Sequence, residues 1–89
     1  MNMVEDYVAR IEETCGEERQ FVVVFKQCKK DEVAAKIMKK ANVEKSISRI
    51  ALELSFEDIS FRLYGTGKAI FRNLKDKEVL QKVLADLLL

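Results

Sequence analysis

Residues 59–73 read ISFRLYGTGKAIFRN, two short runs of alternating apolar and polar residues joined by Gly-Thr-Gly. Alternation with a period of two is typical of a β-strand with one buried face. Because glycine tolerates the positive φ angles of tight turns, the two runs predict a β-hairpin with its turn at residues 65–67. A Gly-Lys pair also occurs in phosphate-binding loops, but those precede a helix, whereas a strand follows Lys68 here.

The rest of the chain is assigned by the same kind of periodicity. Residues 47–54 alternate and predict another strand, and the β-branched and aromatic run 21–27 predicts a fourth. Apolar residues at helical spacing predict a helix over 30–41, and a second one that begins after an N-cap at Asp76. A further amphipathic helix is predicted over residues 3–15.

These elements predict an α+β domain of two layers, an antiparallel sheet of about four strands with two helices on one face. Residues 1–89 are expected to form a single domain, divided into an acidic amphipathic helix over 1–18 and an α+β core over 19–89. The covered sheet face is predicted to bear Ile50, Leu52, Phe61, Leu63 and Phe71.

The run FVVVF at residues 21–25 is apolar on both sides of its strand. A strand of this kind is usually covered on both faces. We therefore expect a second cover on the sheet, from the N-terminal helix or from a second copy of the chain.

The composition argues against several classes of protein. Of 89 residues, 48% are hydrophobic and 35% charged, and none is histidine. Because histidine is the most frequent general base and metal ligand, we expect a non-enzymatic protein with no metal and no cofactor, and we infer no small-molecule substrate.

There is no apolar run of about 18 residues and no signal peptide, so we expect a cytoplasmic protein without a membrane partner. Cys15 and Cys28 are interpreted as buried or semi-buried thiols in the reduced form, and the sequence leaves their redox state open.

Charge is distributed unevenly along the chain. Residues 1–20 carry two basic and six acidic side chains, whereas residues 21–89 carry 14 basic and nine acidic ones. Such a difference in charge between two segments is a hint that the basic segment binds a polyanion. The candidate binding residues lie on the uncovered sheet face, where guanidinium groups can hold phosphates and an aromatic ring can stack on bases. They are Ile47, Arg49, Arg62, Tyr64, Lys68, Ile70 and Arg72.

The chain resembles one repeat of the TATA-box-binding protein family from about residue 19 to residue 89. The most specific stretch is LYGTGKAIFRNLKDKE, residues 63–78, in which Tyr64 takes the place of an aromatic residue and Asp76 that of a helix cap. Each repeat of that family runs strand, helix, antiparallel strands and long helix, and two repeats form a saddle. The resemblance implies a half-saddle fold and, for a chain with one repeat, a homodimer.

In that family the open sheet face enters the minor groove of DNA and apolar side chains wedge between base steps. The resemblance places the wedge positions on Tyr64 and Ile47 and base-contacting positions on Arg62, Ile70 and Arg72. The two arginines stand where the family has a leucine and a threonine, so the face is cationic here. The fold is also similar to accessory domains of some DNA glycosylases and of a class of ribonuclease H. The element order overlaps that of the small dimerising subunit of the KEOPS tRNA-modification complex.

Two functions remain in competition at this point. The first is a DNA- or RNA-binding module that works as a homodimer through its basic sheet face. The alternative is a protein-assembly subunit of a larger complex, which the apolar run 21–25, the apolar stripe of residues 3–15 and the leucine-rich residues 84–89 favour. On the sheet face itself, charged residues that only solvate the surface are a further alternative.

Overall fold

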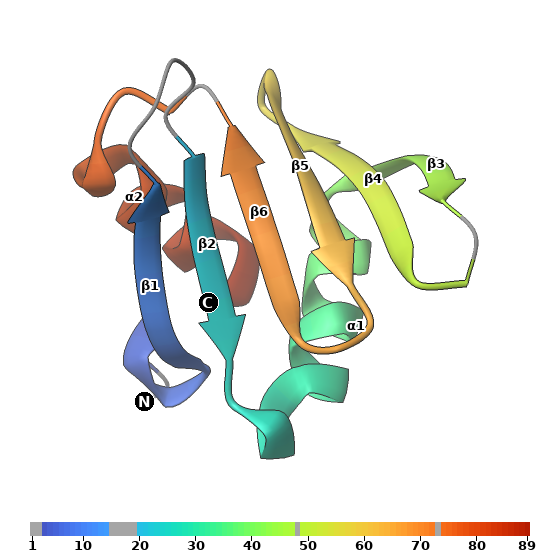
Figure 1. Ribbon diagram of the computed structural model, residues 1–89, viewed down its shortest axis with the longest axis horizontal. Coiled ribbons are helices and arrows are strands. Elements are labelled where there is room, and N and C mark those ends of the chain that lie inside the picture. The colour runs from blue at the N-terminus through green and yellow to red at the C-terminus, as the bar shows by residue number, and fades with distance from the viewer. Residues whose placement is uncertain (1–2, 15–19, 48, 73) are drawn as a thin grey trace.

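The computed structural model describes residues 3–14, 20–47, 49–72 and 74–89. These residues form a six-stranded antiparallel sheet with two α-helices on one of its faces (Figure 1). Across the sheet the strands follow the order β1-β2-β6-β5-β4-β3. The elements are β1 Val8–Thr14, β2 Gln20–Phe25, α1 Lys30–Lys40, β3 Asn42–Ile47, β4 Ala51–Phe56, β5 Ile59–Tyr64, β6 Lys68–Arg72 and α2 Lys77–Leu88.

The hairpin predicted at residues 59–73 is confirmed and lies near the middle of the sheet. β5 and β6 pair directly, with Tyr64 opposite Lys68. In the turn, the Gly67 N–H donates to the Tyr64 carbonyl oxygen at 3.0 Å, and Gly67 has a φ of 94°. A side chain strains this backbone conformation, which is why the turn needs glycine there.

The core lies between the sheet and the two helices, as predicted. Phe61 and Phe71 are paired across β5 and β6 and stack with their ring centroids 4.7 Å apart. The N-cap prediction is also confirmed, since the Asp76 carboxylate accepts a hydrogen bond from the Val79 N–H at 3.0 Å. The buried helix residues are Val33 and Ile37 of α1 and Leu80, Val83, Leu84, Leu87 and Leu88 of α2.

The predicted N-terminal helix is wrong. Apart from a single 3₁₀ turn at Val4–Asp6, the described part of this segment is the strand β1, which pairs with β2. Val8 and Ile11 are three residues apart, which is a helical spacing, yet a bulge after Val8 turns both toward the helix layer. β1 also pairs the backbone of β2, which would otherwise be an exposed sheet edge. Cys15 lies outside the described residues, and the burial predicted for Cys28 is wrong, because Cys28 is exposed in the 3₁₀ turn that follows β2.

The predicted count of about four strands is too low, because β1 and β3 were missed. The predicted strand 47–54 is divided by a turn, so that Ile47 ends β3 and Ala51 begins β4. β3 did not show a clear alternation, because a bulge between Val43 and Lys45 interrupts its register and most of its side chains are exposed. Ile50, predicted to be covered, lies in the turn and is 65% exposed.

The second cover expected over the run FVVVF is not found among the described residues. Phe21, Val23 and Phe25 are buried against the helices, whereas Val22 and Val24 on the other face are only half-buried. The neighbouring strands β1 and β6 provide this partial burial, since β2 lies between them. The strand is therefore apolar on a face that is open to solvent.

Candidate functional site

The sheet face opposite the helices, here called the open face, is the candidate site. Both helices lie behind the sheet in Figure 1, and no other described element lies in front of it. The register sets the side chains of this face in rows. Arg62, Ile70 and Val22 form one row across β5, β6 and β2. Tyr64 and Lys68 lie in the next row, which also contains Val24.

Six of the seven residues predicted from sequence lie on this face. β5 and β6 are neighbours, so their open-face side chains form one patch. Ile47 belongs to the same face, because it pairs with Ala51 and Ala51 pairs with Tyr64. The six are Ile47, Arg62, Tyr64, Lys68, Ile70 and Arg72.

The placement predicted for Arg49 is wrong. Arg49 is in the turn between β3 and β4, and it lines a cleft on the helix side of the sheet rather than the open face. The single predicted strand 47–54 gave no sign of a turn, because its alternation continues through residues 49 and 50. Arg49 therefore does not contribute to the open face.

Arg62 has a partner that the sequence prediction did not assign. Glu53 is directly opposite Arg62 on β4, and one of its carboxylate oxygens accepts hydrogen bonds from Arg62 Nε at 3.1 Å and Nη2 at 3.0 Å. The Tyr64 phenol and the Glu53 carboxylate both raise the pKa of Arg62. Arg62 thus stays charged, but the carboxylate neutralises part of the charge that it presents.

The accessible cations of this face are Lys68 and Arg72 on β6 and Lys45 on β3, which is opposite Glu53 in the strand register. All three are exposed, and none makes an ion pair with another described residue. Lys68 and Arg72 lie on either side of the half-buried Ile70, four positions apart on the strand, which is about 13 Å. At the outer edge, Arg10 is paired with Glu12 at 2.8 Å. Unpaired positive charge is therefore present on β6 and, at Lys45, on β3.

A shallow hollow of about 280 Å³ lies beside this strand. Arg62, Ile70 and Arg72 line one part of it, and Glu44 and Glu53 line another. Glu44 is held in place because the Ser55 hydroxyl donates to its carboxylate at 2.6 Å. An anion in this hollow is thus attracted toward β6 and repelled by Glu44 and Glu53, whereas the exposed Lys45 on β3 offers a further cation nearby.

No protein-family model matches the chain, and no curated protein and no solved structure matches it. Within the described residues, no three side chains of the histidine, cysteine, aspartate or glutamate type gather as a metal site would require. Neither α-helix of the described part combines the length and the apolar character that crossing a bilayer requires. The function of the protein is therefore inferred from the open face and the surfaces around it.

Proposed function

We propose that the protein is a non-enzymatic module that binds nucleic acid on the open face, along β6 and β5. The observation that carries the proposal is the position of Lys68 and Arg72, two exposed cations on an uncovered strand, with Lys68 directly opposite Tyr64. Side chains of these types hold phosphates and stack on bases.

The order of the elements supports the proposal. From β2 onward the chain runs strand, helix, four antiparallel strands and helix. This agrees with the order expected from the resemblance to a repeat of the TATA-box-binding protein family. In that family the face without helices is the one that contacts DNA.

The geometry suggests how a strand of nucleic acid would lie. Phosphates would contact Lys68 and Arg72, so the backbone would follow β6, and a base would stack on Tyr64 at the end of β5. Glu53 and Glu44 would repel the backbone from the hollow beside β6, whereas Lys45 on β3 would offer a further phosphate contact. A single copy offers few cations, so we propose that two copies bind together as a homodimer.

Fluorescence anisotropy with labelled 20-nucleotide single-stranded and duplex DNA and RNA probes tests this function. Each phosphate contact contributes ~0.7 to the slope of log K against log salt for a single strand, so losing two contacts lowers affinity about 65-fold at 50 mM salt. We expect at least this loss for the double variant Lys68→Glu/Arg72→Glu. Tyr64→Leu tests the stacking contact, with an expected loss of ~1 kcal/mol or more.

The matched control is Lys39→Glu/Lys82→Glu, which makes the same change in net charge at exposed positions on α1 and α2. This variant should bind within about twofold of the unaltered protein, because its changes lie behind the sheet. No binding by the unaltered protein at 50 mM salt, or an equal loss in both double variants, would refute the proposal. Light scattering with and without the probe measures whether two copies bind.

A further inference from the structure

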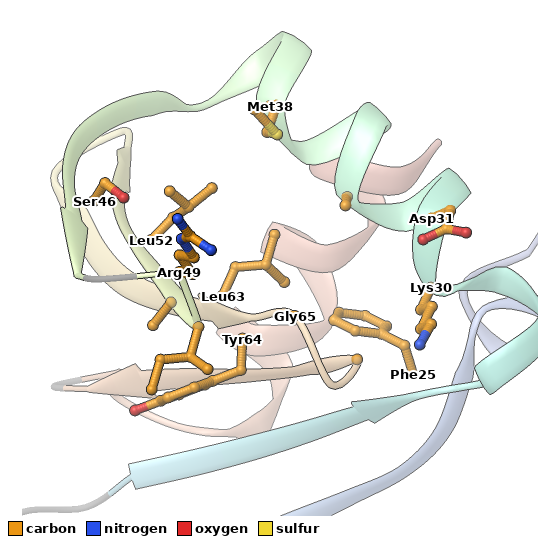
Figure 2. A pocket seen from close by; sticks show the side chains of 14 residues that line it. Phe25, Lys30, Asp31, Met38, Ser46, Arg49, Leu52, Leu63, Tyr64 and Gly65 are labelled. Carbon is orange, nitrogen blue, oxygen red and sulfur yellow. The ribbon is translucent and has the colours of Figure 1, made fainter.

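A cleft of about 480 Å³ opens on the helix side of the sheet, away from the open face. Figure 2 shows that Lys30, Asp31 and Met38 of α1 lie on one side of it and Ser46, Arg49 and Leu52 on the other, with Leu63 between them. The remaining lining is mostly apolar or glycine and consists of Phe25, Ala34, Ile50, Ala51, Tyr64, Gly65 and Gly67.

The cleft exists because two helices are too few for six strands. Strands lie ~4.8 Å apart and a packed helix needs ~10 Å, so a helix covers about two strands. On β2 and β6 the inner side chains Val23, Ala69 and Phe71 are fully buried. At the other side of the sheet, Leu52 on the inner face of β4 is only half-buried. The helix layer thus ends before the sheet does.

Two of the five large exposed apolar side chains among the described residues line this cleft. They are Met38 and Ile50, which are 49% and 65% exposed. A third, Val43, is 47% exposed and faces the helix side of the edge strand β3, opposite the buried Leu54. Apolar side chains that cluster in this way, rather than singly, are typical of an interaction surface.

The shape of the cleft matches a helix. Lys30, Ala34 and Met38 lie four residues apart on α1, so they form one stripe along the helix, about 12 Å long. The cleft therefore runs beside α1 for about two helical turns, over the part of the sheet that a third helix would cover. A helix laid there would extend the existing helix layer by one member.

The charges around the cleft indicate which helix would fit. Lys30 and Arg49 stand at its edge, against the single carboxylate of Asp31. None of these three side chains makes an ion pair with another described residue. An occupant with carboxylates beside its apolar stripe would meet the two cations, whereas a basic one would be repelled.

We propose that this cleft docks an amphipathic α-helix of a partner protein, with an apolar stripe that contacts Met38, Ile50 and Leu52 and acidic residues that contact Lys30 and Arg49. This mode of recognition buries residues of the partner at positions i, i+3, i+4 and i+7. The two proposed surfaces share Tyr64, which also lines the cleft, but the contacts named here do not involve β6 and the proposal does not depend on the nucleic-acid function.

The test uses the full 89-residue chain and synthetic peptides of about 15 residues. Each peptide has leucines at i, i+3, i+4 and i+7, flanked either by glutamates or, in its counterpart, by lysines. A small panel varies the apolar side chains. We expect the glutamate peptides to bind at least about tenfold more tightly than the lysine peptides in anisotropy titrations. Amide chemical shifts should change at Met38, Ile50 and Leu52 and not on β6.

Three variants locate the site. Ile50→Glu should lower the affinity for the glutamate peptides about tenfold or more, because it puts a negative charge into the apolar contact with a negatively charged peptide. Arg49→Glu should reverse the preference between glutamate and lysine peptides. Met3→Glu is the matched control, since Met3 is 59% exposed and does not line the cleft, and it should change neither affinity. All three positions are exposed, so circular dichroism should show unchanged folding.

Several results would overturn the inference. One is the absence of shift changes with every glutamate peptide at millimolar concentration, and another is equal binding of both peptide types. Saturable binding of dodecanoate in the cleft, without peptide binding, would assign it instead to a small amphiphile. A dimer in light scattering that Ile50→Glu dissociates would assign it to a second copy of the chain. Shift changes on β6 alone would place peptide binding on the open face.

Discussion

Replacing Glu53 by glutamine should make the protein bind nucleic acid more tightly. In the structure the Glu53 carboxylate accepts two hydrogen bonds from Arg62 and neutralises part of the positive charge of its guanidinium group. Glutamine has nearly the same shape and no charge, so Arg62 would keep its position on β5 and become available to a phosphate. Under the proposed function, the variant gains one phosphate contact for each chain.

The size of the gain follows from the contacts. For each chain that binds, one additional contact with a single strand adds ~0.7 to the salt slope, so affinity should rise about eightfold at 50 mM salt and about threefold at 200 mM. Folding should change little. The two side chains of the pair are 36% and 37% exposed, and ion pairs with this accessibility contribute about 0 to 1 kcal/mol. The variant is thus expected to bind better while being slightly less stable.

Anisotropy titrations from 50 to 200 mM salt, with a labelled single-stranded probe, measure both the affinity and the slope. The control is Asp86→Asn, which removes one negative charge from an exposed position on α2, behind the sheet. It should raise affinity less than about twofold. If Glu53→Gln leaves the slope unchanged, or if Asp86→Asn has an equal effect, then Arg62 and Glu53 do not control binding on this face.

Three further predictions concern folding, each measured by thermal or urea unfolding. Glu57 and Asp58 form the two-residue turn between β4 and β5, with φ of 48° and 67°. Because glycine adopts positive φ without strain, Asp58→Gly should raise the free energy of unfolding by about 1 kcal/mol, and a loss of stability would contradict this. Phe71→Ala, which removes a fully buried ring stacked on Phe61, should destabilise it by ~3–5 kcal/mol, and a loss below 1 kcal/mol would show that this stack is not central to the core. Gly67→Ala should cost about 1–3 kcal/mol, because φ is 94° and the new Cβ would lie 3.3 Å from Gln27 Nε2; an unchanged stability would mean that the turn can change conformation.

The central part of the fold could be predicted from the sequence because its local signals agree. In residues 59–73 the alternation, the glycine turn and the pairing of Phe61 with Phe71 all favour the same hairpin. α2 was equally clear, with a side-chain cap at Asp76 and an apolar stripe that is buried along its length. At these positions local preference and tertiary packing require the same conformation.

The prediction failed where a bulge changes the period of the pattern. In β1 the bulge brings Val8 and Ile11 to one face at helical spacing, so the segment resembled a helix. In β3 a bulge beside Glu44 removes the alternation, so no strand was predicted. The site prediction failed at Arg49 for a related reason, because the missed turn sends its side chain to the helix side. The pairing of Glu53 with Arg62 could be found only once the register of β4 on β5 was known.

The bulges in β1 and β3 have one more consequence, because these strands are the two borders of the sheet. An irregular border offers an incoming strand from another molecule a broken row of hydrogen-bond donors and acceptors. Edge-to-edge pairing of sheets from different molecules is therefore disfavoured at both edge strands. Deleting Glu44 would remove the irregularity of β3 and leave a regular border with which a strand of another molecule could pair.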